Sequence, residues 1–267
     1  MIARTWLLCS AIFSTCVVAR ADFLDRFFSK SFEVVTNTDV VDPTVQPPSP
    51  GHPVYYLAIS AGYRDLGQPI AGEKIPNSAE VVKLVTKILD RQGYKLATNK
   101  TAPTIMITYS WGTFNPSRPY PDAPYLVTNR NPMLNFLGAS KVGVDTSRTS
   151  TESSLLSIGL TPLAPDAAAL QDMSNDGLYI ITLAAYDFAA AKSGTAKLLW
   201  KTNISSPSSG HYLPEILPSM LTIAAPHIGR ETSRPVLIDV GDKYKPNVEI
   251  GPAQVIEEDV KPDSPRK

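Results

Sequence analysis

Apolar and polar side chains alternate with a period of two in several stretches, and this pattern predicts β-strands. Residues 55–61 alternate in this way, and residues 105–111 do so strictly, with Ile, Ile, Tyr and Trp on one face. A mostly apolar run over 179–187 is followed, after a connection that contains glycine, by a second run from Lys197, which together predict a hairpin. Short strands are also expected over 94–98 and 236–240.

Two other stretches repeat with the helical period. The first follows Asn77 and Glu80, which have the spacing of a capping box, and we expect it to end at Gly93. The second starts near Pro214, which suits a first turn, and Pro218 kinks it or marks a later start. The apolar stripes of the two helices comprise Val81, Leu84, Val85, Ile88 and Leu89 in the first, and Leu213, Ile216, Leu217, Met220, Ile223 and Ala224 in the second.

These elements predict an α+β fold in which two helices pack on one face of a mainly antiparallel sheet. We expect a single domain over residues 54–240. It is interrupted by an insertion over about 115–176 that is rich in Pro, Ser, Thr, Asn and Gly. We expect this insertion to be irregular, with one helical turn or more over 132–137. The polar, proline-spaced residues 241–267 are expected to form an extended, flexible tail.

The N-terminal residues 1–21 have the three parts of a secretory signal peptide. A basic start is followed by an apolar run of about 13 residues and by a small-residue site with cleavage after Ala21. The apolar run is shorter than the roughly 20 residues that span a bilayer. We therefore expect an exported protein, in the periplasm or associated with the cell envelope, with no transmembrane segment once the signal is removed.

Cysteine and charge restrict the chemistry of the mature chain. Both cysteines, Cys9 and Cys16, lie in the signal, so cleavage leaves neither a disulfide nor a thiolate ligand. Cys16 is preceded by Phe, Ser and Thr, which departs from a lipoprotein signal, although lipidation of Cys16 stays open as an alternative. The formal net charge of the whole chain is zero, so no nucleic-acid partner is expected.

Residues 22–35 have helical spacing of aromatic side chains, with Phe23, Phe27, Phe28 and Phe32 on one face. Either this amphipathic helix packs on its own domain or it docks on an envelope protein partner. Residues 36–53 contain five prolines and predict an extended linker that would give the helix reach.

No catalytic signature stands out, so the catalytic residues are unknown and an enzyme is the less favoured class. His211 and His227 lie near opposite ends of the predicted second helix, too far apart to hold one ion, and His52 lies in the linker. No nucleophile elbow or phosphate loop occurs, and no metal or cofactor is expected. We expect the aromatic side chains on the strands to pack in the core. The alternative is that they line a groove that binds peptide or glycan. These residues are Tyr109, Trp111, Tyr186 and Trp200.

The element order resembles a family of bacterial envelope proteins of unknown function, the domain-of-unknown-function family 4136. The matching residues are Gly93-Tyr94 at the end of the first helix, Tyr186-Asp187 at the hairpin corner and Leu198-Leu199-Trp200 in the return strand. The resemblance covers about residues 54–229. The sequence departs from the family's pattern at two points. Thr104 follows Pro103 where family members tend to carry Asp, and the residues before Cys16 differ from the lipoprotein signal that many members have. The resemblance implies the fold and compartment given above, and no activity.

The sequence therefore favours an exported envelope protein that binds or scaffolds another component without catalysis. Two alternatives stay open. One is a hydrolase acting on glycan or peptide, with carboxylates that converge only in the fold. The other is a homo-oligomeric structural protein that pairs through an open sheet edge.

Overall fold

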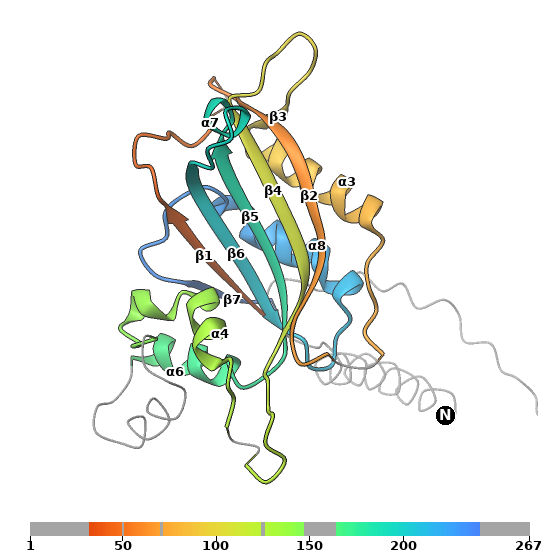
Figure 1. Ribbon diagram of the computed structural model, residues 1–267, viewed down its shortest axis with the longest axis vertical. Coiled ribbons are helices and arrows are strands. Elements are labelled where there is room, and N and C mark those ends of the chain that lie inside the picture. Colours follow the sequence, from red (N-terminus) through yellow and green to blue (C-terminus); the bar gives the residue numbers. More distant parts are fainter. Residues whose placement is uncertain (1–31, 50, 70–71, 124–125, 147–163, 241–267) are drawn as a thin grey trace, which may run out of the picture.

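A computed structural model describes residues 32–49, 51–69, 72–123, 126–146 and 164–240. They form a curled seven-stranded sheet, in the order β3-β2-β4-β5-β6-β1-β7, with helices on both faces (Figure 1). The strands are β1 (Glu33–Val40), β2 (Val54–Gly67), β3 (Tyr94–Leu96), β4 (Ile105–Asn115), β5 (Leu178–Asp187), β6 (Leu198–Pro207) and β7 (Val236–Asp239). The helices are α3 (Ser78–Arg91), α4 (Arg130–Leu137), α6 (Pro165–Met173), α7 (Phe188–Lys192) and α8 (Leu213–Ala224), with 3₁₀ turns η1 (Ala139–Val142) and η2 (Ala225–His227).

The sheet is mixed, so the prediction of a mainly antiparallel sheet is wrong. β2 runs parallel to both of its neighbours, β3 and β4, whereas β4, β5, β6, β1 and β7 follow one another in antiparallel pairs. The cause is helix α3, which carries the chain from β2 back to the end where β2 began. A strand that follows such a crossover runs parallel to the first.

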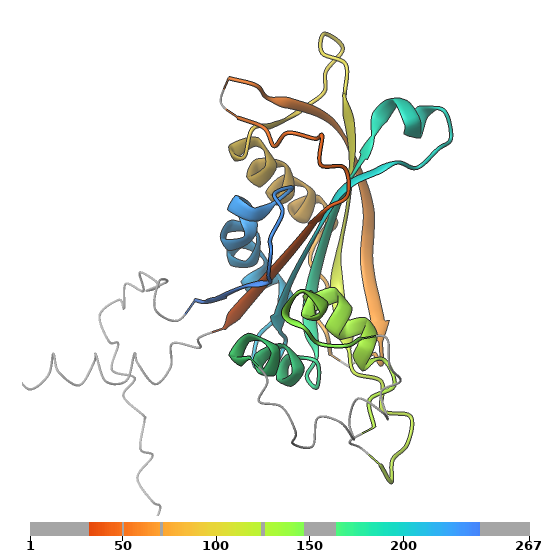
Figure 2. The same cartoon turned by 90° about the vertical axis from the view of Figure 1, so that its left-hand side faces the viewer.

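Helices α3 and α8 pack together on the back of the sheet, as the two apolar stripes predict (Figure 2). Asn77 caps α3, accepting a hydrogen bond from Ala79 N at 2.9 Å, and Gly93 follows its end with φ of 90°. This main core takes side chains from both helices and from the back of the strands, and includes Tyr56, Leu89, Trp111, Leu183, Trp200, Met220 and Leu221.

A second core lies on the front of the sheet, where α4, η1 and α6 cover its lower half (Figure 1). It includes Phe114, Met133, Leu137, Leu170 and Ile180. The prediction that residues 115–176 form an irregular insertion is therefore wrong for 139–142 and 165–173, whereas the helical turn expected over 132–137 is part of α4. Both helices are short, and short helices depend on tertiary packing rather than on a strong local pattern.

Strand β1 is the largest difference from the sequence prediction. Residues 33–40 lie in the sheet between β6 and β7, where the end of an amphipathic helix and the start of a linker were expected. The domain therefore begins before residue 54. The rest of the predicted helix and the predicted signal lie outside the described residues, as does the predicted tail.

Buried polar side chains hold β1 in place and explain why it was missed. Thr38 is fully buried; its hydroxyl donates to His227 O at 2.8 Å and lies 2.8 Å from the Thr202 hydroxyl. The Thr232 hydroxyl accepts from Thr38 N at 2.9 Å. Hydrogen bonding of this kind allows polar residues to occupy a core.

In the described part of the chain, no helix combines the length and apolarity needed to cross a membrane.

Candidate functional site

The outer edge of β2 is open along most of its length. β3 pairs with β2 only through Val54–Tyr56, and beyond that point no described strand lies on this side of β2 as far as Gly67. The other side of β2 pairs with β4 from Tyr56 to Gly67. An unpaired edge presents backbone donors and acceptors to any extended chain that comes alongside. We call residues 57–67 of this strand the β2 edge.

Hydrogen bonds at the top of β2 fix which backbone groups face outward. Tyr56 O accepts from Ala97 N at 2.9 Å, on the side where β3 lies. Backbone groups alternate between the two sides of a strand, so the N–H and C=O of Ala58 and Ser60 face the same way, past the end of β3. The register against β4 then shifts between Ser60 and Gly62, a bulge that divides the β2 edge into two parts.

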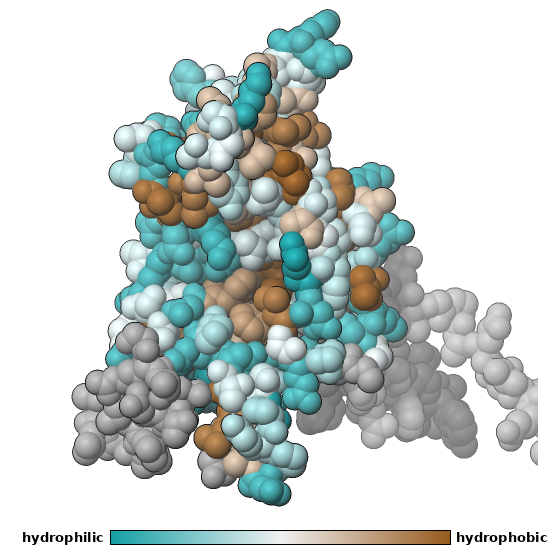
Figure 3. Space-filling view, viewed as in Figure 1, coloured by the Kyte–Doolittle hydropathy of each residue, from teal (hydrophilic) through white to brown (hydrophobic). Residues whose placement is uncertain are grey.

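Apolar side chains lie along the front of the same strand. Leu57, Ile59 and Leu66 are exposed by 43%, 40% and 39%. Their register partners in β4 show that they point away from α3 and α8, and α4 and α6 reach only the lower half of this face. Figure 3 shows apolar surface over the upper part of β2. The site thus combines free backbone groups with an apolar face beside them.

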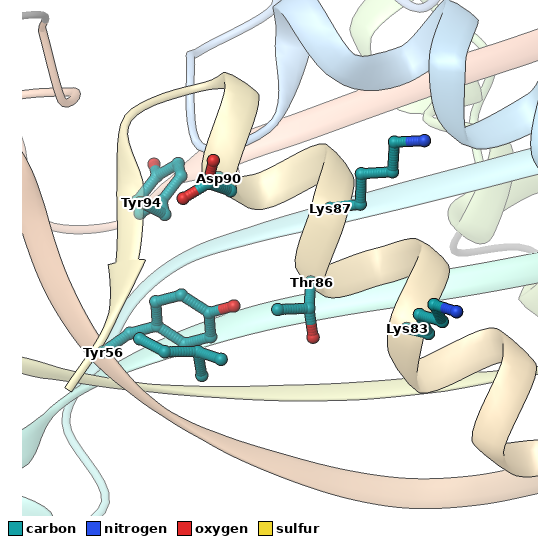
Figure 4. A pocket seen from close by; sticks show the side chains of 7 residues that line it. Tyr56, Lys83, Thr86, Lys87, Asp90 and Tyr94 are labelled. Carbon is teal, nitrogen blue, oxygen red and sulfur yellow. The ribbon is translucent and has the colours of Figure 1, made fainter. Parts of the chain in front are cut away.

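A pocket of about 370 Å³ lies near the same end of the sheet, between α3 and the β2–β3 pair (Figure 4). We call it the α3 pocket; its lining residues are Tyr56, Lys83, Thr86, Lys87, Asp90, Tyr94 and Leu96. Tyr56 lies in the stretch 55–61 that predicts a strand, and the lining residues of α3 lie outside the apolar stripe predicted for that helix. Only the fold brings them together, so no signal in the sequence marks this pocket.

A second cavity of about 380 Å³ lies at the other end of the sheet, where β1 and β7 pair. Its lining includes Glu33, Asp239 and His211, and Glu33 lies directly opposite Asp239 in the ladder. Burial, and then the charge of Asp239, raise the pKa of Glu33. Two carboxylates therefore line this cavity side by side, which is one of the features that the hydrolase alternative needs.

The histidines do not form a site with one another. His211 makes an edge-to-face contact with Phe32 at 5.5 Å between ring centroids, and burial lowers the pKa of His227. His52 is exposed in the loop before β2. Within the described ranges, no three His, Cys, Asp or Glu side chains are placed to hold a metal ion.

The predicted docking face is only partly described. Phe32 is partly buried against the main core, and its carbonyl accepts from Val240 N at 2.9 Å, so this residue belongs to the domain. Phe23, Phe27 and Phe28 lie outside the described residues, and their docking role stays a prediction.

The aromatic strand residues divide between the two faces of the sheet. Tyr109, Trp111 and Trp200 are buried in the main core, whereas Tyr186 is half-buried on the front. The Tyr109 and Trp111 rings stack at 6.4 Å. The three core side chains are thus packed among apolar neighbours and line neither of the two pockets described above.

No family model and no curated protein matches the chain. Its fold is weakly similar to three solved structures. A PDZ domain protein from Parabacteroides distasonis is 12% identical with a TM-score of 0.37; the match covers 82% of this chain but 42% of that one, less than half its length. The PelC dodecamer from Paraburkholderia phytofirmans is 10% identical with a TM-score of 0.31, over 72% of this chain and 95% of that one.

The third structure is a DUF4136 family protein from Bacteroides thetaiotaomicron, which is 10% identical with a TM-score of 0.34. This match covers 74% of the present chain and 97% of that protein. The resemblance to that family, noted above from the sequence, thus extends to the fold only weakly, and membership stays a prediction. Similarities of this size say nothing about what the chain binds.

Proposed function

We propose that this chain is an exported, non-enzymatic binding module that takes up an extended segment of a different protein along the β2 edge. The observation that carries the proposal is the edge itself, where residues 57–67 have no neighbouring strand in the described structure on the side away from β4. Strand addition of this kind draws its affinity from main-chain hydrogen bonds and its specificity from alternate side chains.

The side chains beside the edge support this use. Leu57 and Ile59 would contact every second side chain of an incoming strand on the front of the sheet. Natural proteins usually protect a free edge with lysine, proline or a bulge. The β2 edge has the bulge at Ser60–Gly62, but no lysine or proline between Leu57 and Gly67. Its upper part therefore remains suited to pairing.

Photo-crosslinking in the producing cells tests strand addition. A photo-reactive phenylalanine derivative at Ser60 is expected to form an adduct with a different protein, whereas the same group at Glu80, on the exposed side of α3, forms none. Ala58→Pro removes one outward N–H, and proline is tolerated at such an edge position. We expect this change to reduce the adduct at least tenfold, while the matched control Ala58→Val, which keeps the N–H, preserves it.

Two results would contradict the proposal. An adduct of equal yield in Ala58→Pro and Ala58→Val would show that edge hydrogen bonds are not used. An adduct formed only with a second copy of the chain would instead favour the homo-oligomeric alternative. Circular dichroism of both variants confirms that each retains the fold.

Export to the envelope belongs to the same proposal and rests on the features of residues 1–21. Mass spectrometry of the protein recovered from the periplasm is expected to show a mature chain that begins at Asp22. A chain beginning at a lipid-modified Cys16 would identify a lipoprotein and overturn the predicted cleavage site.

A further inference from the structure

The floor of the α3 pocket contains a buried hydroxyl group that lacks a hydrogen bond of good geometry. Tyr56 is 1% exposed, and its hydroxyl makes no hydrogen bond of good geometry to any described residue. It points toward Thr86 (Figure 4), whose own hydroxyl donates to Val82 O at 2.8 Å. A buried polar group without a good hydrogen bond destabilises the free protein, so a ligand oxygen that accepted from it would be favoured.

The same hydroxyl remains protonated under physiological conditions. Burial raises the pKa of Tyr56 to about 12, and the nearby Thr86 hydroxyl opposes this rise only partly. Tyr56 is therefore available as a hydrogen-bond donor to a ligand, whereas a tyrosinate would repel an anion.

The helix side of the pocket carries positive charge. Lys83 and Lys87 lie one turn apart on α3, and neither forms an ion pair with a described residue. The pocket's carboxylate, Asp90, is paired with Lys95 Nζ at 2.7 Å, which offsets its charge. The two ammonium groups point away from Tyr56 and Tyr94 in Figure 4, and because neither is held in an ion pair with a described residue they can turn toward an anion at the mouth of the pocket.

The remaining wall of the pocket is apolar. The Tyr56 and Tyr94 rings and the Leu96 side chain form it, and Leu96 is 45% exposed on the short strand β3. A cavity of about 370 Å³ is at the small end of the range for small-molecule sites, about 300–1,000 Å³. It would accommodate a short apolar group next to the charged end of a ligand.

We propose that the α3 pocket binds a small organic anion with a short apolar body. An acidic oxygen accepts from the Tyr56 hydroxyl and lies beside Lys83 and Lys87, while the apolar body contacts Leu96 and the tyrosine rings. The pocket and the β2 edge use different residues, so binding here does not depend on strand addition.

Isothermal titration calorimetry of the mature chain with hexanoate tests the site. A ligand of this size is expected to bind with a dissociation constant on the order of 1 mM. Hexanol, which lacks the charge, is expected to bind at least tenfold more weakly, and hexylammonium is expected not to bind. Equal affinity for hexanoate and hexanol, or no heat with hexanoate, would overturn the proposal.

Variants assign the binding to the named groups. The double change Lys83→Gln and Lys87→Gln is expected to weaken hexanoate binding at least tenfold, whereas Lys100→Gln with Lys192→Gln, which removes equal charge elsewhere, leaves it unchanged. Tyr56→Phe is expected to weaken binding about fivefold while keeping or raising Tm, because it removes a buried hydroxyl that lacks a good hydrogen bond. Unchanged binding in Tyr56→Phe or in the Lys83/Lys87 pair would contradict the assignment.

Discussion

Glu33 is a side chain whose ionised form is disfavoured by the folded structure. The side chain is half-buried at the start of β1 and lies opposite Asp239 of β7. Burial first, and the charge of Asp239 second, raise the pKa of Glu33 above its ordinary value of 4.5. The folded chain therefore binds this proton more tightly than the unfolded chain does, and ionisation at higher pH destabilises the fold.

Glu33→Gln is accordingly expected to stabilise the protein near neutral pH. The stability associated with the protonated Glu33 is complete below pH 4.5 and is lost as the pH rises through the raised pKa. Thermal unfolding should thus give a higher Tm for Glu33→Gln at pH 7 and nearly equal Tm values below pH 4.5. Asp122→Asn, on an exposed loop, controls for the change in net charge. A Tm difference that grew toward acid would contradict the argument.

The 3₁₀ turn η1 is attached to two distant segments by one side chain, Lys141. Its ammonium group lies 2.7 Å from Asp39 Oδ1 and 3.0 Å from Glu231 Oε1. It also donates to the backbone carbonyls of Thr38 at 2.7 Å and Thr232 at 2.8 Å. The side chain is 18% exposed, so these contacts are less screened than those of a surface ion pair.

Removing this ammonium group should loosen the attachment of η1 to β1. Lys141→Met keeps much of the aliphatic stem but leaves the two carbonyls and two carboxylates without their shared donor. We expect the free energy of unfolding to fall by about 1–3 kcal/mol in a urea titration. Lys192→Met, on exposed α7, should change it by less than about 0.5 kcal/mol. Equal effects of the two changes would show that the Lys141 contacts contribute nothing.

Elements with a strong local period could be predicted, and those fixed by distant contacts could not. α3, α8, β4 and β6 each carry one apolar face, and β5 is a mostly apolar run; both patterns are visible in the sequence. β1 lacks this pattern because Thr36, Asn37 and Thr38 are polar and yet at most 2% exposed. The hydrogen-bond partners of the Thr38 side chain lie more than 160 positions away along the chain, so the local pattern predicted a linker here.

The candidate sites were even less visible in the sequence. The β2 edge is open because β3 is only three residues long, and strand length and neighbour order are properties of the assembled sheet. The α3 pocket joins Tyr56 to Lys83 and Lys87 across two elements. Neither site carries a residue motif, so spatial proximity alone reveals them.

Across the whole molecule, β1 links the two cores. Val34 packs in the main core behind the sheet, and Val35 packs in the second core in front of it. β1 also separates β6 from β7, which has no other strand beside it among the described residues. A domain that started at residue 54, as the sequence suggested, would lack this strand and its contacts with both cores.

A chain that begins at Val54 is therefore expected not to fold cooperatively. Losing the pairing with β6 and β7 and two buried valines should remove stability comparable to the 5–15 kcal/mol of a typical domain. Circular dichroism should show no sharp thermal transition, whereas the chain that begins at Asp22 should unfold in one step. A cooperative transition in the shorter chain would refute the role given to β1.

The position of β1 also determines when the protein can fold. The hydrogen bond between Thr38 and Thr232 joins residues 194 positions apart, and β1 pairs with β7 near the end of the domain. β1 therefore cannot form these contacts until almost the entire domain has been synthesised. Such long-range closure makes folding slow. A chain that folds late remains unfolded long enough to pass through a translocation channel, and the proposed export requires an unfolded chain.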